Sequence, residues 1–206
     1  MRLWINGRLN MKIINPVYQW AYALTQRRQT THLIIHHAAA SVANAEDVHA
    51  YHKSLGWAGI AYHYIVRKDG TIYTGRPIGM QGGHTVGMNH CAIGICFEGN
   101  FDVEYMPDAQ LEAGQELIAY IVDKYPDIKI CRHSDFNATA CPGKNLPFDW
   151  LVNPNDEGSV ESEDAIPEWA KDALAWCMNR GITDGNRPND TATRAEIWTM
   201  LWRALK

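Results

Sequence analysis

The stretch His133–Gly143 (H-S-D-F-N-A-T-A-C-P-G) sets an imidazole, His133, and a thiol, Cys141, on one irregular loop. Far upstream, Leu33–His37 (L-I-I-H-H) ends an apolar run in two histidines. Together with His36, the loop residues can supply the three protein ligands of an open zinc site, whose fourth position is left to water or a substrate oxygen. Zinc held in this way lowers the pKa of bound water to about 7, so the pattern predicts a hydrolase.

Spacing alone leaves two other interpretations open. In the first, His36 is a hydrogen-bonded core histidine and Cys141 is a buried thiol. In the second, His63 or His84 closes a structural zinc site as a fourth ligand. Other metal motifs are absent from the sequence, which has neither the H-E-x-x-H helix of metalloproteases nor the H-x-E and P-C-x-x-C pair of deaminases.

The elements that must position these residues follow from the hydrophobic pattern and the turn signals. The expected strands are residues 32–36, 61–67, 71–74, 91–97 and 128–131, and the expected helices are residues 45–55 and 108–124. Lys68-Asp69-Gly70 predicts a hairpin between two of the strands, and Asn44 is the expected N-cap of the first helix. Strands and helices therefore mix along residues 30–151, which predicts an α/β sheet with helices packed on it.

The chain divides into four predicted parts. Residues 1–30 are an N-terminal extension, residues 31–151 the α/β domain, residues 152–164 an acidic linker and residues 165–206 a small all-α helix-loop-helix module. The linker is polar and rich in turn formers. In the module, Pro167 stands in a first helical turn and Gly181 just past a helix end, as helix termini prefer.

Composition excludes several classes of protein. A formal net charge of −4 argues against a nucleic-acid binder. No uncharged apolar run reaches membrane-spanning length, so no membrane partner is expected. Five cysteines without a framework spacing fit a reducing compartment. The N-terminus has no apolar signal-peptide core, so we expect synthesis in the cytoplasm without a signal peptide.

Residues 31–151 resemble the zinc-dependent N-acetylmuramoyl-L-alanine amidases of the phage-lysozyme and peptidoglycan-recognition-protein type. The matching pieces are T-H-L-I-I-H-H-A-A, H-K-S-L-G-W-A-G-I-A-Y-H-Y-I-V-R-K-D-G-T-I-Y-T-G-R-P, G-G-H-T-V-G-M-N-H-C-A-I-G-I-C-F-E-G-N-F and R-H-S-D-F-N-A-T-A-C-P-G. The resemblance implies a central mixed β-sheet flanked by helices, one Zn²⁺ ion, and hydrolysis of the bond between N-acetylmuramic acid and L-alanine in bacterial peptidoglycan. The alternative is a related module that binds peptidoglycan without cleaving it.

The resemblance also assigns roles residue by residue. The implied metal ligands are His36, His133 and Cys141. Tyr62 and Thr139 are the implied catalytic residues, as hydrogen-bond donors to the oxyanion; a tyrosine, with an ordinary pKa near 10, suits a donor better than a base. The candidate substrate-binding residues are His84, Asn89 and His37.

Two positions depart from the family pattern. Some relatives carry a catalytic glutamate where this strand has Cys96. Glu98, two residues on, would face the same side of a regular strand, but we assign it no role. Thr139 stands where other members have lysine. These changes favour a tyrosine–threonine version of the site and do not indicate an inactive enzyme.

Residues 165–206 resemble a single S-layer-homology repeat, including I-T-D-G and T-R-A-E. The resemblance implies binding to a secondary cell-wall polymer, although such repeats usually occur three together. The alternative is a helical appendage that packs on the amidase or dimerises. A wall amidase without a signal peptide suits a phage or prophage endolysin that reaches the cell wall by holin-dependent release.

Overall fold

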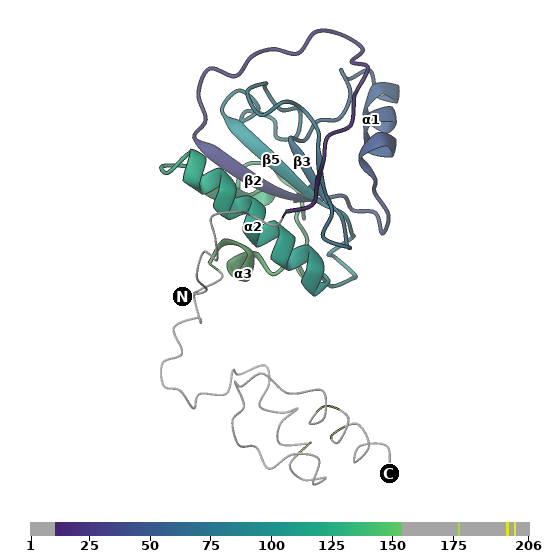
Figure 1. Cartoon of the computed structure of the whole chain (residues 1–206), viewed down its shortest axis with the longest axis vertical. Coiled ribbons are helices and arrows are strands. Elements are labelled where there is room, and N and C mark those ends of the chain that lie inside the picture. The colour runs from purple at the N-terminus through teal and green to yellow at the C-terminus, as the bar shows by residue number, and fades with distance from the viewer. Residues whose placement is uncertain (1–10, 154–176, 178–196, 198–199, 201–206) are drawn as a thin grey trace. The chain divides into compact units, whose positions relative to one another are not determined.

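The computed structural model describes residues 11–153 together with residues 177, 197 and 200 (Figure 1). The chain divides into two units, Met1–Asn155 and Asp156–Lys206. Apart from residues 177, 197 and 200, the predicted helical module at 165–206 lies outside the described residues, as do most of the predicted linker and residues 1–10. The four-part division of the chain therefore stays a prediction, and the architecture that follows is that of the first unit.

The first unit is built on one six-stranded sheet of order β1-β4-β3-β5-β2-β6. Its strands are β1 (Ile13–Ile14), β2 (His32–His37), β3 (Tyr64–Val66), β4 (Ile72–Thr74), β5 (Ala92–Phe97) and β6 (Lys129–Arg132). Neighbours among β3, β5, β2 and β6 are parallel, whereas β4 is antiparallel to β3 and β1 is parallel to β4. The predicted α/β fold with a central mixed sheet and flanking helices is confirmed.

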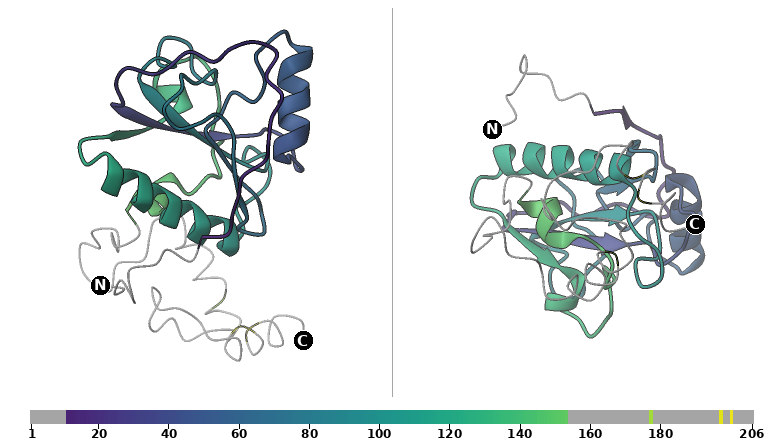
Figure 2. Two further views of the ribbon diagram at one scale, coloured as in Figure 1. Left: turned by 45° about the horizontal axis from the view of Figure 1, so that its top comes forward. Right: turned by 90° about the horizontal axis from the view of Figure 1, so that it is seen from below.

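Helices cover the sheet on both faces, which explains why its central strands are continuously apolar. Helix α2 (Asp108–Lys124) lies along one face, as the two views of Figure 2 show. Its residues Leu117 and Ile121 are fully buried in one cluster with side chains of β2, β3 and β5. Helix α1 (Ala45–Ser54) contributes Ala45 to a second cluster that contains Ile65 and Cys96. Alternating residues of each strand therefore face α2 or α1.

Local signals fix the ends of several elements. The side chain of Asn44 caps α1 by accepting a hydrogen bond of 2.8 Å from the Asp47 N–H, as predicted. Gly70 turns the predicted hairpin with a φ of +79°, in the left-handed region that favours glycine. The 3₁₀ helix His133–Asp135 and helix α3 (Phe148–Val152) were not expected from the sequence. No helix among the described residues has the length and apolarity needed to cross a membrane.

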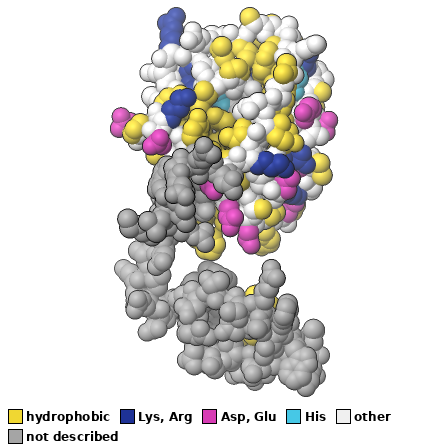
Figure 3. Space-filling model, in the orientation of Figure 1, with side chains coloured by type: hydrophobic (Ala, Val, Ile, Leu, Met, Phe, Trp, Pro, Cys, Tyr) yellow, Lys and Arg dark blue, Asp and Glu magenta, His cyan; other side chains and the backbone are white. Residues whose placement is uncertain are grey.

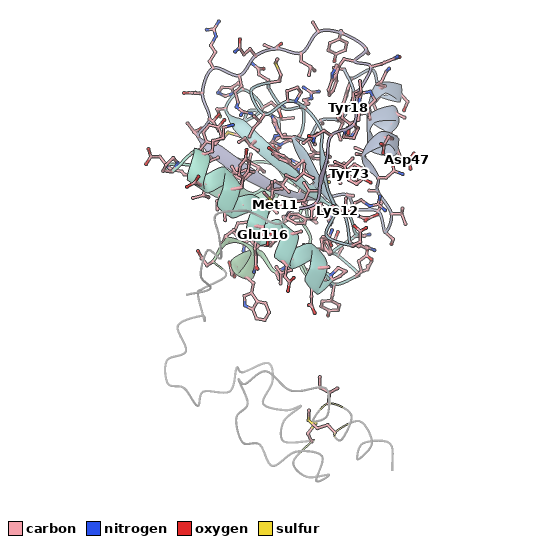
Figure 4. The ribbon with its side chains drawn as sticks, in the orientation of Figure 1. Met11, Lys12, Tyr18, Asp47, Tyr73 and Glu116 are labelled. Atoms are coloured by element: carbon pink, nitrogen blue, oxygen red, sulfur yellow. The ribbon has the colours of Figure 1, made fainter. Side chains whose placement is uncertain are left out.

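Residues 11–30, which the sequence analysis assigns to an extension, contribute to this unit. Ile13 and Ile14 of β1 pair with β4. The Tyr18 hydroxyl donates a hydrogen bond of 2.9 Å to the Thr74 carbonyl, and Figure 4 shows Tyr18 on the segment that runs between the sheet and α1. The buried Arg27 donates hydrogen bonds to the carbonyls of Met80 and Ala92. The segment is therefore held to the sheet by strand pairing and by side-chain hydrogen bonds.

The surface of the first unit carries charges of both signs. On the face drawn in Figure 3, basic and acidic side chains are interspersed with apolar ones. Of the ion pairs in the described residues, Lys68 and Glu104 join two partly exposed side chains, whereas the Glu98 carboxylate that pairs with Arg67 is buried. Charge on this face is therefore mixed and is not gathered into a patch of one sign.

The parallel strands bring the predicted ligand residues to one edge of the sheet. His36 is the penultimate residue of β2, and its register partner on β5 is Cys96. His133 follows directly after β6. In open sheets of this kind, ligands bind at the carboxyl ends of parallel strands. The site is therefore expected at this edge, on the α1 side.

Candidate metal centre and active site

Three side chains converge at the carboxyl edge of the sheet. His36, His133 and Cys141 each offer one ligand atom, and these atoms all lie within 4.8 Å of one another. The Cys141 sulfur lies 3.7 Å from Nδ1 of His36. Ordinary Zn–N and Zn–S bond lengths in a tetrahedron give an N···S separation of about 3.6 Å. The predicted ligand set is thus brought together at a spacing that fits zinc.

Each histidine of this group has its second ring nitrogen beside a hydrogen-bond partner. Nε2 of His133 lies 3.0 Å from the Asn137 side-chain oxygen, to which it donates. Nε2 of His36 lies 3.0 Å from Nδ1 of His84. Because these contacts engage Nε2 of both rings, Nδ1 of each ring is left to face the centre of the group. Hydrogen-bond partners of this kind orient metal-binding histidines.

Burial sets the protonation of the three residues. It lowers the pKa of His36 well below the ordinary value, and the nearby His133 and His37 act in the same direction. Burial also lowers the pKa of His133, although the hydrogen bond to Asn137 acts to raise it. The pKa of the Cys141 thiol is raised to about 11 by burial, while the His37 backbone acts in the opposite direction. At neutral pH the imidazoles are therefore neutral, the form that binds metal, and the thiol must lose its proton on coordination.

Tyr62 lies beside this group. Its ring centroid is 5.2 Å from that of His36 and 5.8 Å from that of His52. Burial raises the pKa of Tyr62 well above its ordinary value, and the neighbouring Cys96 acts in the same direction. The phenol is therefore protonated at neutral pH and available as a hydrogen-bond donor, as the sequence analysis expects.

Thr139 occupies an exposed position on the loop between His133 and Cys141. Its Oγ1 accepts a hydrogen bond of 3.2 Å from the Cys141 N–H, which leaves the hydroxyl hydrogen free to donate. Thr139 also borders a cavity of about 870 Å³ that Lys144 and Trp150 line as well. Neither His36 nor Tyr62 lines this cavity, so it lies beside the candidate site and does not contain it.

The three candidate substrate-binding residues have different surroundings. His84 is buried behind His36, and the Asn89 side-chain oxygen accepts hydrogen bonds from the backbone N–H groups of His84 and Thr85. The His37 ring, next along β2 and so on the other face from His36, is buried and accepts a hydrogen bond from the Phe101 N–H. The structure brings His84 to the metal group and leaves the His37 side chain apart from it.

The remaining polar groups near the sheet have other partners. His63 accepts from the Gly94 N–H at Nδ1, so its Nε2 carries the proton and donates to the Met80 carbonyl at 2.9 Å. Glu98 accepts hydrogen bonds from Arg67 and from the Lys68 and Ala43 N–H groups. Within the described part of the chain, neither His63 nor His84 belongs to a group that could share a metal ion. The geometry therefore gives no support to a fourth protein ligand.

Asn137, Thr85 and Cys96 are contacts of the site to which the sequence analysis assigns no role. Asn137 and Thr85 touch the metal-group histidines or their neighbour His84. Cys96, at the position where some relatives have glutamate, belongs to the buried cluster against which Tyr62 packs. Asn137 lies four residues after His133 on one loop, and this short separation is the signal that could have pointed to it.

The comparison with known families gives the class of protein that carries this group of residues, an amide hydrolase that acts on the cell wall. Residues 26–144, more than half of the chain, match the family N-acetylmuramoyl-L-alanine amidase, and the chain belongs to it. It is an enzyme that hydrolyses the amide bond between N-acetylmuramic acid and L-alanine, and its substrate is bacterial peptidoglycan.

Among its relatives is an endolysin of Enterobacteria phage T3, 32% identical over 136 residues that cover 61% of this chain and 89% of the relative. The amidase LysCS from Clostridium intestinale URNW is 38% identical, with a TM-score of 0.67 over 69% of this chain and 94% of that structure. Peptidoglycan recognition protein-LE, solved in complex with tracheal cytotoxin, is 28% identical, with a TM-score of 0.61 over 66% and 89%. The similarity thus spans phage endolysins and peptidoglycan-recognition proteins.

Proposed function

We propose that the amidase uses one zinc ion held by His36, His133 and Cys141, with one coordination position left open. The observation that carries this proposal is the convergence of their three ligand atoms within 4.8 Å of one another. His63 and His84, the candidates for a fourth ligand, have other partners in the described residues. When bound, zinc acts as a Lewis acid and lowers the pKa of water to about 7.

The protein's own groups prepare this site for the amide. The protonated Tyr62 hydroxyl donates a hydrogen bond to the substrate carbonyl oxygen as negative charge develops on it. The Thr139 hydroxyl, whose oxygen already accepts from Cys141, donates the second hydrogen bond. Burial of the neighbouring His36 and Cys141 strengthens the interaction of Tyr62 because few water molecules compete for this donor, whereas the Thr139 hydroxyl is exposed.

Digestion of purified peptidoglycan tests the activity and the ligand set together. The wild type should release free L-alanine amino termini without new reducing sugar ends. Cys141→Ala should release neither, whereas Cys131→Ala, a change outside the site, should match the wild type. Reducing ends would indicate a glycosidase, and binding without cleavage would indicate a recognition module.

Metal analysis tests the cofactor separately. The wild type should contain one equivalent of zinc, lose activity on dialysis against a chelator and regain it with added zinc. Cys141→Ala and His133→Ala should contain less zinc. A fully active protein without metal, or equal zinc content in these variants, contradicts the proposed centre.

We also propose an endolysin role, with synthesis in the cytoplasm and holin-dependent release to the cell wall. The matches to phage endolysins support this role. A separate proposal concerns residues 165–206, whose resemblance to an S-layer-homology repeat supports binding to a secondary cell-wall polymer.

Expression in a bacterial host tests the release step of the endolysin role. Lysis should need a co-expressed holin, and wall degradation without one would contradict the proposal.

A further inference from the structure

The surroundings of His84 indicate a role in the metal site. His84 is only 7% exposed, so little of its ring is available to a substrate. Its Nδ1 lies 3.0 Å from Nε2 of His36 and 2.9 Å from the Thr85 hydroxyl oxygen. That oxygen is itself 3.4 Å from Nε2 of His36. The back of the metal-group histidine therefore faces two potential hydrogen-bond acceptors.

The fold holds the His84 ring in this place. A Cβ atom on Gly94, in the middle of β5, would lie 2.5 Å from the His84 ring, and one on Gly82 would lie 2.4 Å from it. Such distances are shorter than real contacts, so the two glycines make the space that the ring fills. From the other side, Asn89 fixes the backbone by accepting from the His84 and Thr85 N–H groups at 2.8 and 3.0 Å.

The direction of the His36–His84 hydrogen bond decides whether His36 can bind a metal through Nδ1. If Nε2 of His36 donates to Nδ1 of His84, then Nδ1 of His36 carries a free lone pair. If the bond runs the other way, the proton of His36 sits on Nδ1 and blocks the ligand atom. The other ring nitrogen of His84, Nε2, is buried without a hydrogen-bond partner among the described residues. Metal binding through Nδ1 of His36, which faces the Cys141 sulfur at 3.7 Å, requires that this nitrogen carry the proton of the neutral His84 ring. A proton at that nitrogen leaves Nδ1 of His84 as the acceptor.

We propose that His84, supported by Thr85 and held in the space left by Gly82 and Gly94, is a positioning residue that fixes His36 in its metal-binding tautomer. This inference rests on the proposed zinc site. It gives Asn89 a related role, since Asn89 holds the loop that carries His84 and Thr85. Outer partners of metal-binding histidines typically change metal affinity by about 10- to 100-fold.

Zinc affinity, measured by competition with a chromogenic chelator, tests the proposal without relying on activity. His84→Leu removes the acceptor and should weaken zinc binding about 10- to 100-fold. His84→Asn keeps an oxygen near the place of Nδ1 and should lose clearly less. Gly94→Ala, which displaces the ring, should resemble His84→Leu. The matched controls are Gly79→Ala, where a Cβ meets open space, and His90→Leu at an exposed histidine.

Nitrogen NMR of the metal-free wild type gives a second readout that needs no variant. We expect His36 to carry its proton on Nε2 before zinc is added. A proton on Nδ1, or an even mixture of tautomers, overturns the proposal, as does a folded His84→Leu that binds zinc within about twofold of the wild type. If His84→Leu does not fold, His84→Asn and the NMR measurement decide. A wild type that binds no zinc at all refutes the metal site itself, which is a different outcome.

Discussion

The Tyr62 hydroxyl is the group on which the proposed chemistry depends most directly. Because burial raises the pKa of this phenol well above its ordinary value, it enters the reaction as a donor. Tyr62→Phe removes the donor and keeps the ring contact with His36. Loss of one oxyanion donor typically slows turnover about 10²- to 10³-fold. We therefore expect kcat to fall by this amount, as measured by release of L-alanine amino termini.

The zinc content of Tyr62→Phe should equal that of the wild type, because the hydroxyl is not a ligand. Tyr64→Phe is the matched control, since Tyr64 is buried in the cluster on the α2 face of the sheet. It should leave kcat unchanged. Full activity of Tyr62→Phe would remove Tyr62 from the mechanism.

Thr139 offers a second prediction because its hydroxyl both accepts from the Cys141 N–H and retains a hydrogen to donate. Thr139→Val keeps the side-chain shape and removes both functions, so we expect kcat to fall at least about tenfold. Thr139→Ser keeps the hydroxyl and should retain most of the activity. Equal rates for the valine and serine variants would show that the hydroxyl does not take part.

His52 links residue chemistry to stability. Its Nδ1 accepts the Ala61 N–H at 3.1 Å, and burial, together with Arg76 and His49, lowers its pKa from 6.5 to about 4. Between pH 6.5 and pH 4, His52 therefore binds a proton in the unfolded chain but not in the folded chain. The free energy of unfolding should fall with pH in this window, by about 3 kcal/mol from this residue.

Urea unfolding at pH 7 and pH 4.5 measures this effect. His52→Asn keeps an acceptor for the Ala61 N–H but does not titrate, so its stability should depend less on pH than that of the wild type. His90→Asn, at an exposed position, should behave like the wild type. An unchanged pH dependence in His52→Asn would contradict the assignment.

At the scale of elements, the segment before β2 is attached through the buried Arg27. Its guanidinium donates to the backbone carbonyls of Ile78, Met80 and Ala92. Arg27→Met removes the donors and leaves these carbonyl oxygens without the hydrogen bonds from Arg27. We therefore expect the free energy of unfolding, measured in urea, to fall by about 2–4 kcal/mol. The neighbouring Arg28 is exposed, so Arg28→Met should cost almost nothing. Equal effects would mean that the segment adds no stability through Arg27.

The sequence predicted those elements whose signals are local. The apolar run of β5, the Asn44 cap and the Lys68-Asp69-Gly70 turn each depend on neighbouring residues, and all three were confirmed. Strand β1 could not be predicted in this way, because two residues carry no period and pair only with a distant strand. Helix α3 is similarly short, with five residues.

The site was predictable to a smaller extent. Family resemblance pointed to His36, His133 and Cys141, and the structure brings them together. The surroundings of His84 and His37 were not predictable, because they depend on which side of a strand or loop a ring faces. His84 fills space that Gly94 leaves open on a different strand, and sequence separation hides such a contact.

At the scale of the whole molecule, helix α3 sets the shortest C-terminally truncated chain that keeps the amidase unit intact. Leu151 is fully buried in the main cluster, and the Gln115 side chain donates to the Trp150 carbonyl at 2.8 Å. Val152, which the sequence analysis assigns to the linker, is the last residue of this helix. A truncation meant to remove the C-terminal module should therefore keep residues up to Asn153.

A chain ending at Asn153 should unfold at nearly the same urea concentration as the amidase unit of the full protein. It should also hydrolyse soluble muropeptides at the full rate, because the ligands and Tyr62 remain. Its binding to intact cell walls should be weaker than that of the full chain. Extraction of the secondary polymer from the walls should reduce the binding of the full chain to the same level. A chain ending at Pro147 loses Leu151 and should be destabilised by about 2–5 kcal/mol. If the chain ending at Asn153 is inactive on soluble muropeptides, residues 154–206 are a structural part of the enzyme and not a targeting module.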